Sequence, residues 1–590
     1  MTNFVAACAE VEAWLSSLGP SIETLSPSLI QKLYRDRGFA QGWRLRVAFS
    51  DSERLLDLLL PEGFPWQPPR VALVDAPEYL TWPHVERDHV LCLTPNTSET
   101  NPDDPVGVAA FLLGEAEEAI NDFIAGKCYK DFSDEFLTYW HNASDSGMEM
   151  ISLLRAEGPA RMVSLWRGKK FYLLAESPEE VRSWLANRHG NAAETVKPIE
   201  AVFAWVGTPS KPRDYPHTGV ALRSLLAAHS PTALQMLEAL AADNPNEVTT
   251  VLGFDTANGP ALAGVLIKAP NKEKYGPQNP ISKGFRRGKV PNSVLAARFF
   301  GGQAIVRRPI ERADASWIHG RGNDSRTEKL RRMKVVLLGC GSLGAPIAIA
   351  LAQAGLGHQI LVDFDMLKYA NTSRHPLGSS SVDKMKARAL AMKLRADFPH
   401  AKFDFLEADV DTCVRKHSEI LNQADLIIAA TGSWAADSRL DAWQSTVERK
   451  VPILYTWMEA HATSGHAILL DGDCAALKSG FNETGVPHFR VANWPGGSPL
   501  RQEPACGAIY QPYGAIELGF VCNLASELAL DALLGNMHAP IYRLWIGPSR
   551  RLHELGGEWT ASWRADQNFR DVGGFLTERA WGTVKREQAA

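Results

Sequence analysis

The sequence predicts an α/β protein with a doubly wound C-terminal domain on a parallel sheet, an α+β N-terminal domain and a mixed α/β region between them. Residues 335–365 read VVLLGCGSLGAPIAIALAQAGLGHQILVDFD, the pattern of a strand, a glycine turn, a helix and a second strand. Residues 43–93 instead alternate short apolar runs with turn formers, which is typical of an antiparallel meander. A length of 590 residues leaves room for three or four domains.

The C-terminal unit carries the pattern of a nucleotide site. Its first strand, VVLL, is apolar at every position, as expected of a parallel strand covered by helices. The strand leads into Gly339, Gly341 and Gly344, spaced G-x-G-x-x-G. Such glycines allow a tight turn and bring backbone N–H groups close to a phosphate at the next helix N-terminus. Asp363 ends the second strand, at the position of a ribose-binding acid.

The same stretch is long, apolar and uncharged between Lys334 and Asp363. A membrane-spanning helix needs roughly 20 continuous apolar residues. Five glycines divide this segment into three short elements, so the sequence favours a nucleotide fold over a membrane span.

The residues after the second strand favour ATP over a nicotinamide cofactor. Asn371, Arg374 and Lys386 follow Asp363 and Asp365 along the chain. A triphosphate that is attacked at its α-phosphorus needs positive charge on the departing phosphates, whereas a dinucleotide does not. The alternative is that Arg374 and Lys386 are ordinary solvated charges beside a helix.

These motifs also carry a family resemblance. The run GCGSLG, the triplet DFD, the pattern N-x-x-R and a lysine twelve residues after that arginine resemble the ThiF/MoeB-type adenylation domain. This domain occurs in ubiquitin-activating enzymes and in molybdopterin- and thiamine-pathway activating enzymes. The resemblance implies a Rossmann-like fold and ATP with Mg²⁺ as cofactors. It implies ribose binding by Asp363 and phosphate binding by Arg374 and Lys386.

The expected magnesium ligand departs from the family pattern. Related domains carry an aspartate in a T-D-N turn after the next strand, but here the strand LIIAA leads into Thr431-Gly432-Ser433. Glycine has no side-chain oxygen, and Mg²⁺ prefers carboxylates. Asp437 or Asp365 therefore remains as the candidate metal ligand.

The N-terminal region suggests a second catalytic module. Residues 63–71 hold three prolines within five positions, which predicts a rigid extended loop. Trp82-Pro83-His84 follows, Cys92 comes eight residues after His84, and residues 108–124 form a helical pattern. This order resembles the ubiquitin-conjugating fold. The resemblance implies that Cys92 is catalytic and that His84 replaces the asparagine that steadies the oxyanion. The alternative is an inert core cysteine in an apolar strand.

An activating enzyme of this kind also needs a thiol near the adenylate. Cys340 lies in the glycine turn. Cys522 lies in an apolar helical stretch and, like Cys413 and Cys474, is expected to be a packing residue. Cys506 lies in a loop rich in glycine and proline, where a thiol can accept an acyl group. An ordinary loop cysteine is the alternative. Eight scattered cysteines without a C-x-x-C pair indicate neither a disulfide framework nor a structural zinc site.

Taken together, the motifs predict three regions: a ubiquitin-conjugating-like domain at 1–145, a middle domain at 146–325 and the adenylation domain at 326–590. The arrangement resembles the ancillary ubiquitin-transferase-like proteins of CBASS anti-phage operons. That resemblance implies an enzyme that adenylates a protein C-terminus, with a cGAS-like nucleotidyltransferase as the partner. It also implies a homodimer in which Arg321 or Arg326 reaches the neighbouring ATP.

Composition and the alternatives complete the expectations. A net charge of −5 gives no overall attraction to nucleic acid or membrane, and the N-terminus lacks a secretory pattern, so a cytoplasmic protein is expected. A sulfur-carrier adenylyltransferase, which needs no Cys92, and a non-catalytic scaffold remain as alternatives.

Overall fold

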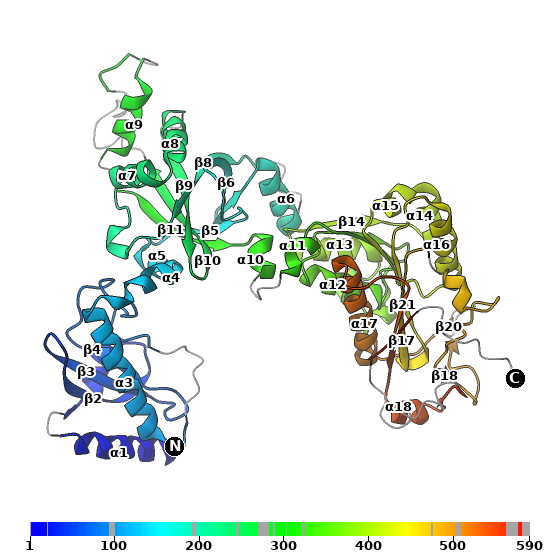
Figure 1. The fold of residues 1–590 in the computed structure, drawn as a ribbon, viewed down its shortest axis with the longest axis horizontal. Coiled ribbons are helices and arrows are strands. Elements are labelled where there is room, and N and C mark those ends of the chain that lie inside the picture. Colours follow the sequence, from blue (N-terminus) through cyan, green and yellow to red (C-terminus); the bar gives the residue numbers. More distant parts are fainter. Residues whose placement is uncertain are drawn as a thin grey trace. The chain divides into compact units, whose positions relative to one another are not determined.

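A computed structural model describes most of the chain and divides it into two compact units (Figure 1). The first unit spans Met1–Glu176 and Pro198–Glu311, and the second spans Ser177–Lys197 and Arg312–Ala590. The described residues are 2–19, 22–93, 101–190, 196–243, 247–268, 283–286, 289–301, 304–320, 325–473, 476–502, 509–561 and 576–580. Within these ranges, every helix is too short or too polar to cross a membrane.

The first unit begins with the predicted antiparallel meander. Its strands pair in the order β1-β2-β3-β4, and the aromatic and aliphatic residues of the sheet face α1 and α3. Trp43, Leu58 and Ile120 are almost fully buried in this core. The elements are β1 (Ile22–Thr24), β2 (Phe39–Ala48), β3 (Glu53–Pro61), β4 (Arg70–Leu73), α1 (Thr2–Ser17), α2 (Pro27–Leu33) and α3 (Pro105–Ile124).

Local sequence signals explain where the long helix α3 begins. Asp104 caps it by accepting a hydrogen bond from the Gly107 N–H at 2.8 Å, and Pro105 occupies the first turn. The helix covers the predicted range 108–124, which confirms that expectation. By contrast, Val90 and Leu91 form only isolated bridges, so the apolar run before Cys92 is not a regular strand. Three short helices follow: η1 (Lys127–Lys130), α4 (Asp131–Asp134) and α5 (Phe136–Ala143).

The rest of the first unit is a closed barrel with strand order β10-β11-β5-β7-β6-β8-β9. The two ends of this order, β10 and β9, pair with each other, so the barrel has no free edge strand. The elements are β5 (Glu149–Ser152), β6 (Arg161–Arg167), β7 (Phe171–Ala175), β8 (Ile199–Gly207), β9 (Glu247–Thr256), β10 (Gly259–Lys268), β11 (Val306–Arg312), η3 (Pro212–Asp214), α7 (Gly219–His229), α8 (Pro231–Asp243) and α9 (Asn292–Phe300).

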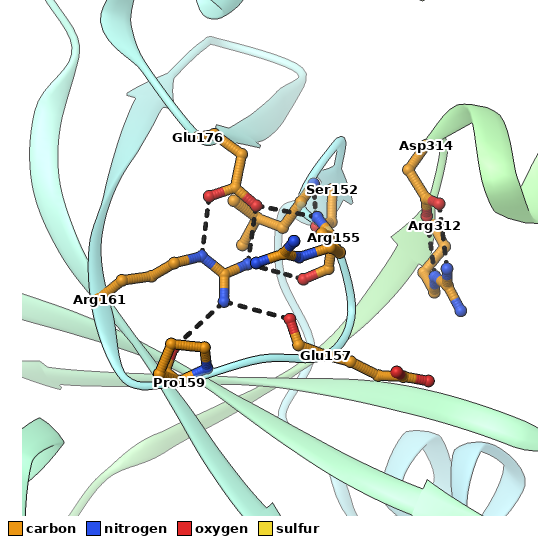
Figure 2. A network of polar contacts seen from close by, with 9 residues as sticks. Ser152, Arg155, Glu157, Pro159, Arg161, Glu176, Arg312 and Asp314 are labelled. Carbon is orange, nitrogen blue, oxygen red and sulfur yellow. Dashed lines mark hydrogen bonds and ion pairs between the residues drawn. The ribbon is translucent and has the colours of Figure 1, made fainter. Parts of the chain in front are cut away.

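One arginine ties the loop between β5 and β6 to the barrel (Figure 2). Arg161 donates from Nε and Nη2 to the two carboxylate oxygens of Glu176, at 2.8 and 2.7 Å. The same guanidinium donates to the backbone carbonyls of Arg155, Glu157 and Pro159. Although burial opposes ionisation of Glu176, the bonds from Arg161 lower its pKa. The network is therefore a charged clasp on an otherwise irregular loop.

The second unit contains the predicted doubly wound sheet. Its strand order is β14-β13-β12-β15-β16-β17-β21-β23, with parallel pairing from β14 to β16 and antiparallel pairing beyond. Val335 and Leu337 face one apolar core, and Val336 and Leu338 face the other. Helices α12, α13 and α17 supply the first core, and α14 and α16 the second. The fold class of this domain is confirmed.

The second unit has the following element bounds. Its strands are β12 (Lys334–Leu338), β13 (His358–Val362), β14 (Lys402–Leu406), β15 (Leu426–Ala429), β16 (Ile453–Met458), β17 (Ser464–Leu470), β18 (Ala492–Asn493), β19 (Arg501–Gln502), β20 (Ile509–Tyr510), β21 (Ile541–Ile546), β22 (Glu558–Trp559) and β23 (Leu576–Ala580). Its helices are α10 (Ala315–Gly320), α11 (Arg326–Leu330), α12 (Gly344–Gln353), η5 (Tyr369–Asn371), η6 (Ser379–Ser381), α13 (Lys386–Asp397), α14 (Val410–Lys416), α15 (Ser418–Asn422), α16 (Trp434–Thr446), η7 (Ala460–Ala462), η8 (Leu477–Gly480), α17 (Ala515–Leu534) and α18 (Ser549–Glu554).

Helix α6 (Pro178–His189) interrupts the barrel sequence between β7 and β8 but belongs to the second unit. Ser177 caps it by accepting from the Glu180 N–H at 3.2 Å, with Pro178 in the first turn. The helix contacts α13, and the Asn187 side chain donates to the Pro399 carbonyl at 3.2 Å. The division into regions at 145 and 325 remains a prediction, and the sequence did not indicate that this helix belongs to the second unit.

Candidate functional site

The sheet order reverses at β12, and the candidate nucleotide site lies at that point. β12 pairs in parallel with β13 on one side and with β15 on the other, so the chain leaves β12 in one direction and returns on the opposite side. The carboxyl ends of β12 and β15 therefore open a crevice of the kind that binds ligands in doubly wound folds. Two loops meet there: residues 339–343 and residues 430–433.

The three glycines of the G-x-G-x-x-G pattern, Gly339, Gly341 and Gly344, have different roles. Gly339 has a φ of 93°, and a Cβ there would lie 2.6 Å from the Ala430 carbonyl oxygen. At Gly344, the first residue of α12, a Cβ would lie only 1.9 Å from the Gly339 oxygen. Gly341 has open space where its Cβ would be, with no heavy atom within 4 Å among the described residues. Two glycines thus close the turn, and the third leaves the backbone open to a ligand.

The Asp363 carboxylate holds the glycine loop through hydrogen bonds to backbone N–H groups. One of its carboxylate oxygens accepts from the Cys340 N–H at 2.7 Å, and the other accepts from the Asp365 N–H at 2.7 Å. Asp363 is 9% exposed and lines a cavity of about 400 Å³ together with Gly339 and Asp365. The predicted ribose contact remains a prediction, and the structure adds a second role for the same carboxylate in holding the loop.

His375 also holds the glycine loop, through the Cys340 carbonyl. The sequence analysis did not identify this residue. Its Nε2 lies 2.7 Å from the Cys340 carbonyl oxygen, and its Nδ1 lies 3.2 Å from the Leu377 backbone nitrogen. Because the carbonyl accepts and the amide donates, the ring is neutral with its proton on Nε2. Burial lowers the pKa of His375, which favours that neutral form. The available signal was the R-H-P-L-G run, in which His375 directly follows Arg374.

The predicted phosphate-binding cations lie close to this loop. Lys386 is the first residue of α13, and its Nζ lies 3.0 Å from a carboxylate oxygen of Asp365. The Arg374 guanidinium lies over the Tyr513 ring at 4.6 Å. Asn371 accepts from the Lys368 N–H through its side-chain oxygen, so it stabilises the turn that carries Arg374. Phosphate binding by these side chains stays a prediction.

A second cavity, of about 430 Å³, lies on the other side of the glycine loop. Thr431 and Ser433 line both cavities, Gly339 lines only the first and Gly341 only the second. We call the first the Asp363 cavity and the second the Asp437 cavity. The Asp437 cavity is otherwise rich in aromatic side chains, namely Trp434, Trp457, Phe481 and Tyr513. The loop thus separates an acidic cavity from an aromatic one.

The two candidate magnesium ligands, Asp437 and Asp365, line different cavities. Asp437 accepts from the Thr431 hydroxyl at 2.8 Å, and burial raises its pKa to about 7. Asp365 lines the other cavity and is paired with Lys386. Among the described residues, no group of three or more His, Cys, Asp or Glu side chains is placed to hold a metal ion. Asp437 remains a predicted ligand, and no catalytic step is assigned to Mg²⁺.

The second candidate centre is in the first unit. Cys92 is exposed, and its N–H donates to the His84 carbonyl at 2.8 Å. Partial burial of the thiol, then Glu86, raises the Cys92 pKa. The His84 ring nitrogens lie 3.2 Å from an Asp131 oxygen and 3.6 Å from a Glu135 oxygen. The structure therefore joins Cys92 and His84 through the backbone, and the oxyanion role of the ring stays a prediction.

Among the other described cysteines, Cys8 and Cys128 are partly buried and three are buried. Cys413 and Cys522 are buried, as expected for packing residues, and Cys340 is buried too; burial raises the pKa of each of the three thiols. Cys506, the predicted acyl acceptor, lies outside the described residues, as do Cys474 and Arg321. Arg326 begins the short helix α11.

Comparisons with known proteins match both modules. Residues 318–508 match the ThiF family, and residues 32–148 match prokaryotic E2 family B. The ATP-dependent ubiquitin transferase-like protein Cap2 of Pseudomonas aeruginosa is 24% identical over 508 residues, which cover 80% of this chain and 84% of that protein. The molybdopterin-synthase adenylyltransferase of Haemophilus influenzae is 28% identical over 164 residues, which cover 28% of this chain and 61% of that protein.

One solved structure with partial similarity is that of Escherichia coli MccB with MccA-N7isoASN. The similarity covers 44% of this chain and 69% of that chain, at 15% sequence identity and a TM-score of 0.30. The sequence matches, rather than this structure, account for the assignment of the two modules.

Proposed function

We propose that this chain is a ubiquitin transferase-like enzyme, which joins a ThiF-family adenylation domain to a prokaryotic E2-family domain and conjugates a protein C-terminus to an amine. The observation that carries the proposal is the presence, in one chain, of a braced glycine loop between two cavities and an exposed thiol in the E2-family domain. A sulfur-carrier adenylyltransferase needs only the first of these features.

The proposed reaction begins with activation. The substrate carboxylate attacks the α-phosphorus of ATP, an acyl-adenylate forms and pyrophosphate leaves. In this proposal the backbone N–H groups near Gly341 and the cations Arg374 and Lys386 offset the developing negative charge. The open space at Gly341, and the contacts of Arg374 with Tyr513 and of Lys386 with Asp365, support this assignment. Holding the two reactants in neighbouring cavities supplies much of the remaining rate acceleration.

Two thiols then carry the acyl group. The Cys506 sulfur attacks the adenylate carbonyl, forms a thioester and releases AMP. The Cys92 sulfur takes the acyl group from Cys506, and a target amine attacks the Cys92 thioester to give an amide and a free thiol. The exposure of Cys92 supports this assignment, because a donor thiol must reach both partners.

The partners follow from the family resemblance. We propose a cGAS-like nucleotidyltransferase as the protein whose C-terminus is activated, a cytoplasmic location, and a homodimer in which Arg321 or Arg326 approaches the neighbouring nucleotide. Light scattering at micromolar concentration tests the dimer. A monomer under those conditions contradicts it.

An intact-mass series tests the order of the thiols. The purified full chain is incubated with ATP, Mg²⁺ and the candidate substrate, with and without reductant. Cys506→Ala is expected to form the adenylate but no thioester. Cys92→Ala is expected to hold a reducible adduct at Cys506 and to form no amide. Cys413→Ala, a buried cysteine of the same chain, is the control and retains both stages.

The outcomes separate the alternatives. A Cys506→Ala protein that still loads Cys92 contradicts Cys506 as the first acceptor. Adenylation and sulfur transfer that survive Cys92→Ala unchanged, with no amide formed by wild type, indicate the sulfur-carrier class. Failure of wild type to exchange pyrophosphate with any substrate indicates a scaffold.

A further inference from the structure

Helix α5 (Phe136–Ala143) lies in the first unit (Figure 1). It packs on the barrel and also contacts the loop that carries His84. Phe136 and Trp140 are each 1% exposed and join the apolar core of the barrel. The Phe136 ring lies 4.5 Å from that of Phe254, and the Trp140 ring 5.1 Å from that of Tyr215. The Trp140 indole also donates to the Arg308 carbonyl at 2.9 Å. One face of the helix is therefore fixed to the barrel.

The chain just after α5 is fastened to the same strand of the barrel. The Arg308 side chain donates to the carbonyls of Asp145 and Ser146, at 2.6 and 2.8 Å. The Asp145 carboxylate accepts from the Arg307 N–H at 2.9 Å. Both arginines belong to β11, so helix and connecting segment are held together.

Tyr139, on the flank of the same helix, contacts the loop that carries His84. Tyr139 is 6% exposed, and its phenol oxygen accepts from the His84 N–H at 3.0 Å. The phenol donates in turn to a Glu135 carboxylate oxygen at 3.1 Å. The T-shaped contact of its ring with Phe132, at 4.7 Å, fixes its direction.

His84 links this tyrosine to the thiol. Its φ is 58°, a left-handed conformation that is unfavourable for a residue with a Cβ and needs support from its surroundings. The Tyr139 oxygen holds its N–H, and its carbonyl holds the Cys92 N–H at 2.8 Å. Two successive hydrogen bonds thus connect the side chain of α5 to the backbone of Cys92.

We infer that Tyr139 is a positioning residue for Cys92, acting through the His84 backbone, and that the barrel serves this site by anchoring α5. The inference rests on the proposed role of Cys92 as the final acyl donor. It also assigns a structural role to the middle region, because a closed barrel is a rigid support for a helix of only eight residues.

The direct test is Tyr139→Phe, which removes the oxygen and keeps the ring. Without an acceptor the His84 N–H loses its partner, and the left-handed backbone relaxes. We expect single-turnover amide formation from Cys92 to fall about tenfold, the scale of one lost hydrogen bond, while pyrophosphate exchange stays unchanged. Tyr34→Phe, which removes a buried phenol bonded to Asp57 in the same domain, is the control and leaves amide formation unchanged.

Two readouts do not depend on transfer activity. Iodoacetamide modification of Cys92, followed by peptide mass spectrometry across pH, reports the environment of the thiol. The pH dependence of the Cys92 modification rate is expected to change in Tyr139→Phe and to stay the same in Tyr34→Phe. Hydrogen exchange in wild type is expected to show protected amides at His84 and Cys92, which tests the relay even if Tyr139→Phe does not fold.

The results distinguish the relay from the proposed function. Unchanged Cys92 modification and unchanged amide formation in a folded Tyr139→Phe protein overturn the relay, as does rapid exchange of the His84 amide in wild type. If Cys92→Ala conjugates as well as wild type, while Cys92 modification changes in Tyr139→Phe and the His84 amide is protected in wild type, the relay stands and the proposed donor role of Cys92 fails.

Discussion

A pair of histidines in the second unit makes its stability sensitive to acid. His319 of α10 and His400, which follows α13, face each other with their Nε2 atoms 2.8 Å apart. The His319 Nδ1 lies 3.2 Å from the Gln353 carbonyl oxygen, so it carries a proton, and the neutral ring accepts at Nε2. His400 must then donate from Nε2. Its Nδ1 is left bare and buried without a partner among the described residues.

Protonation of this pair is unfavourable in the folded state. Burial, followed by the neighbouring His319, lowers the His400 pKa from 6.5 to about 4, opposed only in part by Asp314. Between these two values the unfolded chain binds more protons than the folded chain. Stability is therefore fully present above pH 6.5 and is lost as the pH falls toward 4. The two pKa values correspond to a loss of about 2 kcal/mol at pH 5 relative to neutral pH.

The perturbation is His400→Gln, which keeps a donor and removes the titration. We expect wild type to lose about 2 kcal/mol more than the variant between pH 7.5 and pH 5. Hydrogen exchange of peptides from residues 315–320 and 398–403 measures this loss of stability around the histidine pair, after correction for the intrinsic pH dependence of exchange. His417→Gln, in an exposed part of the same unit, is the control and keeps the wild-type pH dependence. Equal pH dependence in wild type and His400→Gln refutes the reasoning.

Three further changes test other parts of the molecule. Gly344→Ala places a methyl group against the glycine loop and is expected to weaken ATP binding at least tenfold by calorimetry, whereas Gly519→Ala, with open space on α17, leaves it unchanged. Lys386→Ala is expected to abolish substrate-dependent pyrophosphate exchange, so unchanged exchange counts against its phosphate role. Arg161→Lys breaks the paired bonds to Glu176 and is expected to destabilise the first unit by about 1 to 3 kcal/mol in urea unfolding, and a difference near zero contradicts the clasp.

Local patterns predicted the elements that local physics determines. The glycine unit became β12, α12 and β13, because strand apolarity and turn glycines act within a few residues. The meander and α3 followed for the same reason. These features gave the fold class of both catalytic modules.

Features that depend on distant pairing escaped the sequence. The barrel places its first strand, β5, beside its last strand, β11, and no local signal specifies that partner. His375 and Tyr139 act by hydrogen bonds to the backbone of other loops, which residue type and spacing do not reveal. Cys506 was proposed from loop composition alone and lies outside the described residues.

Because α6 belongs to the second unit, that unit is built from two separate segments of the sequence. Val181, Trp184 and Leu185 are all buried, and the helix contacts α13. A fragment starting at residue 312 would contain the whole sheet yet expose the apolar surface that α6 covers. Because the chain enters the second unit, returns to the barrel and enters again, a single cut cannot release two intact halves. Recombination that exchanges the adenylation module between relatives must therefore carry residues 177–197 with it, or replace that apolar surface.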